Sequence, residues 1–338
     1  MLKTKSFIVL ISAALLVGFC SCKATVTPDG KKYKAGDIAL AKIKIGTTKY
    51  DNTAEVYVTG KNGARVTGAD PSFVDSEANI GYKGVFRDGM NVTLSPYIMS
   101  KYQVTQELYE TVMTDQMIEG NALTAAPFTC KETGDYPKVA EETQKYRPAE
   151  SVTWYDAVFF CNALTEKTMT TADKVYTITD ITVSSGHITN ATVTADITKK
   201  GYRLPTEAEW EFAARDGRGS SPTPYAGNAN INQVAWYGEN SGIRTHDVAT
   251  KDPNNLNLYD MCGNVAEWCW DYYSPVLASG AQTNPHGPSS GEMHVKRGGS
   301  WLDDPQQCTV FYRSGSAPSG KSSNLGFRVV CSAVSETM

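Results

Sequence analysis

The distribution of helical periodicity constrains the fold of this chain more than any other feature. Apolar residues recur at helical spacing only between residues 105 and 217, and this periodicity disappears after Gly217. From there to Val330 the chain consists of short aromatic stretches, typical of strands, and loops rich in Asn and Gly. Few helices packed on small sheets define the α+β class. We therefore predict an α+β domain with few helices and irregular β-rich loops.

Helix-start signals support three helices, in QELYETVM, WYDAVFFCNALTEK and EAEWEFAA. Each follows a threonine that can cap its first turn: Thr105, Thr153 and Thr206. Thr153 with Asp156, and Thr206 with Glu209, have the spacing of a capping box. Between the second and third helices, residues 169–199 are rich in Thr and alternate like a β-ribbon, so we expect a ribbon there.

The first residues have the features of an export signal. Two lysines precede an apolar run over residues 7–19, which is too short to span a bilayer permanently. The run ends at Cys20-Ser21-Cys22, which resembles a bacterial lipobox. We predict a lipoprotein signal peptide over 1–22, lipidated at Cys22 or, alternatively, at Cys20. The protein is then exported and lipid-anchored in the outer membrane, at the cell surface; an ordinary signal peptide is the other interpretation.

Composition divides the rest of the chain. Residues 23–83 are rich in Lys, Thr, Asp and Gly and contain short alternating stretches, which predicts a spacer with strand character. Residues 84–331 form the main domain, and 332–338 a C-terminal tail. The net charge is −4 without a basic stripe, which disfavours a nucleic-acid partner. We expect a monomer that contacts the membrane only through its lipid anchor.

Six cysteines follow the signal segment: Cys130, Cys161, Cys262, Cys269, Cys308 and Cys331. Export permits disulfides, but six cysteines allow fifteen full pairings, and spacing does not choose among them. No two of the six form a CxxC pair, and the four histidines are isolated. A zinc site is therefore not expected. Cys161 falls on the apolar side of its predicted helix, which indicates a core residue.

Four stretches, in this order and spacing, carry a family resemblance: SVTWYDAVFFCNAL, RLPTEAEWEFAARDG, NLYDMCGNVAEWCWDYY, and RGGSW with NLGFRVV. Together they resemble the formylglycine-generating enzyme (sulfatase-modifying factor) family, whose fold is C-type-lectin-like. The resemblance covers residues 84–331. It implies that the α+β domain has the C-type-lectin-like fold of the formylglycine-generating-enzyme type.

The enzymes of this family oxidise a cysteine in sulfatases. They use two cysteines of their own, placed after Gly-Gly-Ser, whose thiolates bind copper. Here the matching segment, LDDPQQC, contains only Cys308. Asp303 and Asp304 are hard oxygen ligands and cannot replace a soft thiolate. We therefore predict no catalytic residues and no formylglycine-generating activity; the alternative is a related oxidase that uses the single cysteine.

The same resemblance implies a structural calcium ion, and no other cofactor. Carried over to this chain, the family's oxygen ligands are Asp260, Gly263, Val265 and Glu267. The other interpretation is that Glu267 satisfies loop backbone groups without a metal. The family also has a disulfide between a helix and the final strand, which would join Cys161 to Cys331 here.

The end of the chain also resembles the variable proteins of diversity-generating retroelements. It contains RGGSW, three free positions, a fixed stretch with Cys, an Arg, further free positions, Pro and LGFR. In these systems Asn codons of the AAY type are randomised, which never yields Lys, Gln, Glu, Met or Trp. Trp301, Gln306, Gln307 and Lys321 should then be fixed. The variable region, 302–324, would offer these ligand-binding side chains: Leu302, Asp303, Asp304, Phe311, Tyr312, Ser314, Gly315, Ser316, Gly320, Ser322, Ser323 and Asn324.

The leading hypothesis is a surface-displayed protein that binds a varying ligand, expected to be a protein, through its C-terminal face. Arg313 and Arg328 would fix the loops between them by pairing with buried carboxylates or carbonyls. The lectin-like fold does not by itself imply sugar binding, because function depends on the site. A static envelope lipoprotein remains the third interpretation, in which these positions are ordinary loop residues.

Overall fold

The computed structural model describes residues 84–86, 90–131, 139–217 and 223–332, with short strands at 25–26, 32–33, 55–58 and 64–65. The predicted lipidation residues Cys20 and Cys22 lie outside the described residues, as do most of the predicted spacer and tail. Within the part of the chain that is described, no helix combines the length and the hydropathy needed to cross a membrane.

The predicted helices are confirmed as α1 (Gln106–Met113), α2 (Trp154–Thr168) and α3 (Glu207–Ala214). The structure also contains a one-turn helix that was not predicted, α4 (Ile231–Val234). The hydroxyl of Thr105 accepts a hydrogen bond from the backbone of α1, and both predicted capping boxes are formed. Three 3₁₀ turns cover Gln144–Tyr146, Thr171–Asp173 and Pro305–Cys308.

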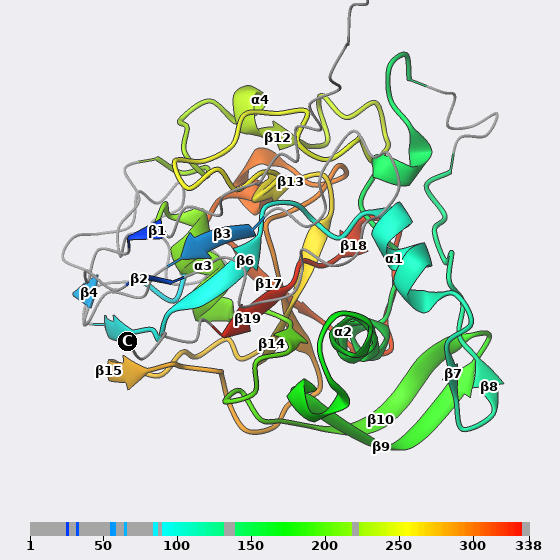
Figure 1. Ribbon diagram of the computed structural model, residues 1–338. Coiled ribbons are helices and arrows are strands. Elements are labelled where there is room, and N and C mark those ends of the chain that lie inside the picture. Colours follow the sequence, from blue (N-terminus) through cyan, green and yellow to red (C-terminus); the bar gives the residue numbers. More distant parts are fainter. Residues whose placement is uncertain are drawn as a thin grey trace, which may run out of the picture.

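A four-stranded antiparallel sheet crosses the middle of the molecule (Figure 1). Its strand order is β11 (Tyr202–Arg203), β19 (Val330–Ser332), β6 (Tyr97–Ser100) and β3 (Glu55–Val58). Side chains of β6 alternate between two hydrophobic cores, with Ile98 in the core of α1 and α2 and its neighbours Tyr97 and Met99 in the core of α3. The sheet therefore separates two helical layers.

A second four-stranded sheet carries most of the C-terminal region. Its order is β17 (Arg313–Ser316), β16 (His294–Arg297), β14 (Ala266–Tyr272) and β18 (Leu325–Gly326). β17, β16 and β14 are antiparallel neighbours, whereas β18 runs parallel to β14. The predicted variable region thus begins after β16, supplies the edge strand β17, and ends at the opposite edge beside β18.

Strands from the predicted spacer pair with strands of the main domain. β3 pairs with β6, and β4 (Ala64–Arg65) pairs with β5 (Met90–Thr93), which also pairs with β15 (Gly280–Thr283). The Thr-rich ribbon is confirmed as the hairpin of β9 (Tyr176–Ser184) and β10 (His187–Ala195), which contacts α2 (Figure 1). Three further pairs are β1–β2 (Thr25–Val26, Lys32–Tyr33), β7–β8 (Met117–Ile118, Asn121–Ala122) and β12–β13 (Ala235–Trp236, Cys262–Gly263).

The cysteines depart from one expectation. Cys161, which lies on α2, is buried in the hydrophobic core of α1 and α2, as predicted. However, Cys161 and Cys331 are thiols in the structure, so the disulfide implied by the family resemblance is not formed. Both lie in the same apolar core, where burial raises the pKa of the Cys161 thiol far above its usual range. A buried thiol of this kind packs as a small apolar side chain.

Candidate functional site

Both ends of the predicted variable region meet around the buried side chain of Ser300. Its hydroxyl donates a hydrogen bond to the carboxylate of Asp303 at 2.5 Å and accepts one from the side-chain amide of Asn324 at 3.0 Å. The hydroxyl of Ser322 in turn donates to Asn324 at 2.6 Å. Segments about 20 positions apart in the chain therefore form one face, which we call the Ser300 face: residues 302–304 and 322–324.

The buried residue Trp301 holds this face to the rest of the domain through two hydrogen bonds. It is only 5% exposed, its indole N–H donates to the carbonyl of Ser323 at 3.0 Å, and its backbone N–H donates to the carbonyl of Asn264 at 2.9 Å. One bond holds the 322–324 segment to the Trp301 ring and the other holds the Trp301 backbone to Asn264, so one buried residue joins both loops.

A loop that the sequence did not point to borders the Ser300 face. The hydroxyl of Ser241 donates to the carbonyl of Trp301 at 2.7 Å, and the N–H of Gly238 donates to the carbonyl of Asp303 at 3.0 Å. Two residues after Ser241, Ile243 is 65% exposed, and Leu302 on the face itself is 60% exposed. The face therefore has apolar as well as polar contact groups.

A short polar relay links Asp304 to Tyr312. Asp304 caps the 3₁₀ turn Pro305–Cys308, and the side-chain oxygen of Gln307 accepts a hydrogen bond from the backbone N–H of Asp304 at 3.2 Å. The amide of Gln307 also lies 3.4 Å from the hydroxyl of Tyr312, to which it donates. Gln307, which we expect to be fixed, thus supports two positions that we expect to vary.

Most of the predicted ligand-binding side chains are accessible. Leu302, Asp304 and Ser322 are exposed, and the following are half-buried: Asp303, Tyr312, Ser314, Gly315, Ser316, Gly320, Ser323 and Asn324. The expectation for Phe311 is wrong. Its side chain is 0% exposed and packs in the core of α3, so it cannot contact a ligand.

Five of the accessible positions lie outside the Ser300 face: Tyr312, Gly320 and three residues of β17. Ser314, Gly315 and Ser316 lie on β17, at the sheet edge opposite β18. A Cβ atom on Gly315 would lie 2.8 Å from the side chain of Tyr273, so any substitution there must displace that ring. Gly315 is accessible in the structure, but it is less replaceable than its neighbours because it lies against Tyr273.

Cys308, the single cysteine after Gly-Gly-Ser, is sealed in the core. Its side chain is fully buried. The backbone of Gly299 approaches the Cys308 sulfur closely because glycine has no Cβ, which would lie only 2.6 Å from that sulfur. Burial raises the pKa of the Cys308 thiol well above its usual range, and the nearby Cys262 and Asp303 raise this pKa further. The group is a neutral thiol at physiological pH, whereas metal binding and nucleophilic attack need the thiolate.

We expect Cys308 to resist alkylation in the folded protein. Iodoacetamide reacts with thiolates, and both burial and the raised pKa withhold this form up to pH 8 or above. Mass spectrometry after native labelling should show Cys308 unmodified, whereas labelling in denaturant should modify it fully. Rapid native labelling of Cys308 would contradict this environment, and it would favour the oxidase alternative.

The predicted calcium ligands surround a side-chain amide. The Nε2 atom of Gln103 lies 2.8 Å from the carbonyl oxygen of Val265, 3.0 Å from a carboxylate oxygen of Glu267 and 3.4 Å from the carbonyl oxygen of Gly263. Asp260 also points an oxygen at Nε2, at 3.2 Å, but this is its carbonyl rather than its carboxylate. The four residues therefore converge, around a nitrogen that donates hydrogen bonds.

The charge on this cage is already balanced. The carboxylate of Glu267 accepts two hydrogen bonds from the guanidinium of Arg328, at 2.7 and 2.8 Å, and one from the indole of Trp210 at 2.7 Å. Asp260 instead accepts from the backbone of Ala249 through its carboxylate, which is buried and has a pKa raised to about 6. With the Gln103 amide donating to all four oxygens, the cage does not fit a calcium ion, because these oxygens already share one hydrogen-bond donor.

The two anchoring arginines are paired as expected. Arg328 binds Glu267, and Arg313 binds both carboxylate oxygens of Glu207, at 2.7 and 2.6 Å. Glu207 also accepts from Arg297, the last residue of β16 before the Gly-Gly-Ser turn. Both ends of the variable region are therefore attached to the core by buried, charge-assisted hydrogen bonds.

Comparison with known proteins gives the class of this protein. The model of the sulfatase-modifying factor enzyme 1-like domain matches residues 44–333, so the chain belongs to this family. Among solved structures, Treponema denticola variable protein 1 superposes with a TM-score of 0.63 and 32% identity, covering 82% of this chain and 94% of that one. The C-type-lectin-like α+β fold and the resemblance to variable proteins are thus confirmed.

Two curated relatives differ in how much of them this chain matches. The protein described as chaperone protein LppX from Paenibacillus barcinonensis is 33% identical over 261 residues, which are 71% of this chain and 81% of that protein. The formylglycine-generating enzyme of Streptomyces coelicolor is 38% identical over 161 residues, which are 42% of this chain and 50% of the enzyme. This chain therefore spans about half the length of that enzyme.

Proposed function

We propose that this protein is an exported, lipid-anchored surface protein that binds varying ligands through its C-terminal face. The ligand is a protein, contacted first by Leu302, Asp303 and Asp304 together with Tyr312 and the 322–324 segment. Exposed apolar and charged groups lie side by side here, as in other protein-binding surfaces. Similarity to proteins named as a variable protein and as a chaperone supports a binding role.

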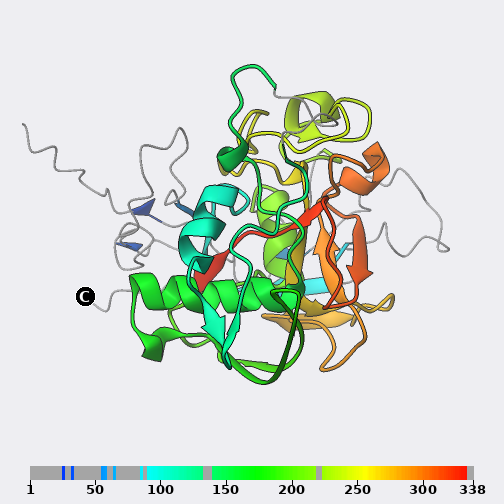
Figure 2. The same cartoon turned by 90° about the vertical axis from the view of Figure 1, so that its right-hand side faces the viewer.

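One observation carries the proposal: exposure separates the positions expected to vary from those that hold the fold. The residues that attach the region to the core are all buried: Trp301, Cys308, Arg313, Phe327 and Arg328. Between them, every predicted variable side chain except Phe311 reaches the surface. Figure 2 shows the orange strands of this part of the chain on the right-hand side of the molecule and its red end crossing the middle. A rigid frame with replaceable surface residues can change specificity without refolding.

We further propose that the protein is not a formylglycine-generating oxidase. The segment after Gly-Gly-Ser contains one cysteine instead of two, and this residue, Cys308, is a buried neutral thiol. Carboxylates do not provide the soft ligands that select Cu(I). The protein therefore lacks the thiolate pair that the oxidation requires.

Deep sequencing of codons 297–330 in a serially grown population tests the proposed variation. We expect substitutions at the Ser300 face and at Tyr312, a near-identical template in neighbouring DNA, and no substitution at Trp301, Gln306, Gln307 or Lys321. Phe311 should also be invariant, because truncating a buried Phe costs about 3–5 kcal/mol. An invariant face without a template would exclude diversification and leave the static lipoprotein.

A further inference from the structure

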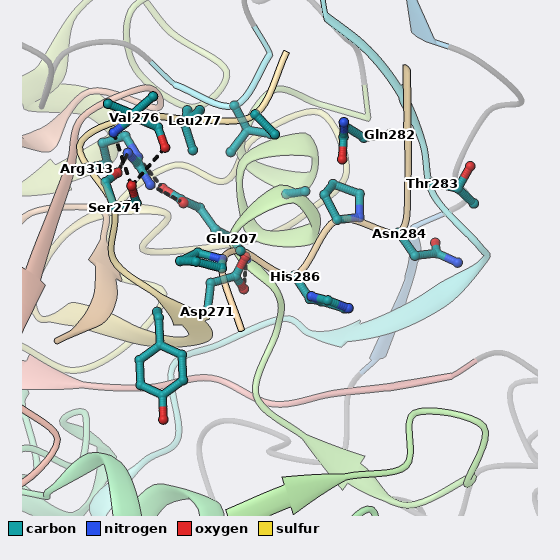
Figure 3. A pocket seen from close by; sticks show the side chains of 17 residues that line it. Glu207, Asp271, Ser274, Val276, Leu277, Gln282, Thr283, Asn284, His286 and Arg313 are labelled. Carbon is teal, nitrogen blue, oxygen red and sulfur yellow. Dashed lines mark hydrogen bonds and ion pairs between the residues drawn. The ribbon is translucent and has the colours of Figure 1, made fainter. Parts of the chain in front are cut away.

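A cavity of about 350 Å³ lies outside the Ser300 face (Figure 3). The start of α3 forms one wall, the end of β14 another, and the loops over 274–278 and 284–288 complete it. None of the residues 302–304 or 322–324 lines this cavity, and Arg313 is its one contribution from the predicted variable region. The cavity is therefore a separate site from the one proposed above.

Nearly all the charged groups on its walls are already satisfied. Both carboxylate oxygens of Glu207 accept hydrogen bonds from Arg313, and one also accepts from Arg297. Arg313 donates additionally to the carbonyl of Ser274 at 2.6 Å. Figure 3 shows these bonds between Glu207, Arg313 and Ser274 at one end of the cavity. The hydrogen bonds of Glu207 and Arg313 are therefore made within the protein and do not require a ligand.

Asp271 is the exception. It is 3% exposed, and one carboxylate oxygen, Oδ2, accepts from the backbone N–H of Glu207 at 2.8 Å. The other, Oδ1, accepts no hydrogen bond from any described residue. It lies on the side of Gly287, another residue of the cavity lining, because a Cβ on that glycine would be 3.3 Å from Oδ1. A buried carboxylate oxygen without a donor is a strong hydrogen-bond acceptor for a ligand.

The electrostatics at Oδ1 favour a cation. Burial raises the pKa of Asp271 well above its usual range, and the negative charges of Glu207 and Glu209 raise it further. The positive charge of Arg313 lowers this pKa, but Arg313 is bound to Glu207, and the two carboxylates outweigh it, so the potential at Asp271 is negative on balance. Apolar side chains form much of the remaining wall, including Val85 and Leu277. A ligand with a positive donor at one end and a hydrocarbon segment at the other matches both features.

We propose that this cavity binds an alkylammonium group, from a free amine or a lysine side chain. Its ammonium donates to Oδ1 of Asp271, and its hydrocarbon chain lies along Val85, Ala208 and Leu277. The inference does not depend on the proposed variation of the C-terminal face, because Asp271 and these wall residues lie outside residues 302–324.

Calorimetry and NMR titration with three probes of equal length, hexylamine, hexanol and hexanoate, test this proposal. We expect hexylamine to bind at least about 10-fold more tightly than hexanol, and hexanoate not to bind. Ammonium binding requires ionised Asp271, whose folded pKa is raised, so affinity should rise with pH through that pKa and the complex should release protons below it. Tighter binding of hexanol, with affinity falling as pH rises, would mean that protonated Asp271 donates to a neutral ligand and would overturn the proposal.

Three variants locate the site. Asp271→Asn retains an oxygen for the backbone N–H of Glu207 but removes the charge, and it should weaken hexylamine at least about 10-fold. Ala278→Trp narrows the cavity from an exposed wall position and should weaken all binding without disturbing the core. The control Asp115→Asn removes an exposed charge elsewhere and should leave affinity unchanged. Equal hexylamine affinity in the native protein and in folded Asp271→Asn or Ala278→Trp, or no binding to the native protein, would overturn the proposal.

A fourth probe distinguishes the two sources of the ammonium group. Lysine with both backbone ends blocked carries the same alkylammonium on a peptide unit. If it competes with hexylamine for the native protein, the cavity accepts a lysine side chain. If it does not compete while hexylamine binds, the ligand is a free amine.

Discussion

Replacing Glu211 with Gln is expected to lower the free energy of unfolding by about 3–5 kcal/mol. Glu211 is fully buried in α3 and accepts hydrogen bonds from Arg215 at 2.8 Å and Arg297 at 2.7 Å. It also accepts from the backbone N–H groups of Val85 at 2.7 Å and Phe86 at 3.2 Å. Removing its charge leaves two guanidinium groups in the core with less compensation, and the new amide N–H₂ faces donors rather than acceptors.

Chemical denaturation of the native protein and of the variant measures this loss. Glu166→Gln is the matched control, because Glu166 pairs with Lys174 at 2.7 Å on the surface, where ion pairs contribute about 0–1 kcal/mol. If both variants lose the same small amount, the buried pair does not contribute as argued.

The same carboxylate should make stability depend on pH in the acid range. Burial raises the pKa of Glu211, but Arg215 and Arg297 and the bonds from Val85 and Phe86 lower it, and the net pKa is below its usual value. The folded pKa is therefore lower than the unfolded one, about 4.3. Its stabilisation is present above the unfolded pKa and is lost as pH falls through the folded pKa. The stability difference between the native protein and Glu211→Gln should shrink below about pH 4.

The second large effect is expected at Gln103. The melting temperature of the native protein should be the same in calcium as in a chelator, because Nε2 of Gln103 already donates hydrogen bonds to the four oxygens. Gln103→Glu places a second carboxylate beside Glu267 and should destabilise the protein in chelator by about 3–5 kcal/mol. Calcium should restore part of this loss, about 2.7 kcal/mol at 100 times its dissociation constant, because the variant offers two carboxylates and three carbonyls.

The orientation of the Gln103 amide supports this expectation. Four oxygens converge on Nε2, whereas Oε1 is buried without a hydrogen-bond partner among the described residues. Turning Oε1 toward the cage would set five acceptors against one another. Gln103→Leu is the control and should be destabilised equally with and without calcium. If the chelator destabilises the native protein, a cation rather than the amide holds the cage together.

Local features were predictable wherever the sequence supplies the partner within one turn or one hairpin. The Thr153–Asp156 and Thr206–Glu209 caps form as expected, since each hydrogen bond joins residues three positions apart. The Thr-rich ribbon is likewise visible in its alternation. The fold itself was recognised from ordered motifs rather than from periodicity, because its short strands and loops carry little periodic signal of their own.

Side-chain environments in the candidate sites were less predictable. Phe311 and Tyr312 are adjacent aromatic residues, and only packing against the core of α3 places Phe311 inside and leaves Tyr312 at the surface. Gln103 lies about 160 residues before the calcium ligands proposed from the motif, so nothing local indicated that its amide would meet them. The cavity around Asp271 likewise assembles distant segments.

The sequence by itself determined the helix caps, the Thr-rich hairpin, the family motifs and the presence of a single cysteine in the segment after Gly-Gly-Ser. These depend on residue identity or on hydrogen bonds between near neighbours. Only the tertiary structure decided that residues 302–304 meet 322–324 at Ser300 and that Cys308 is a buried thiol. Burial and pairing over long distances arise when separate segments pack into one core, and their energies depend on partners that local sequence does not name.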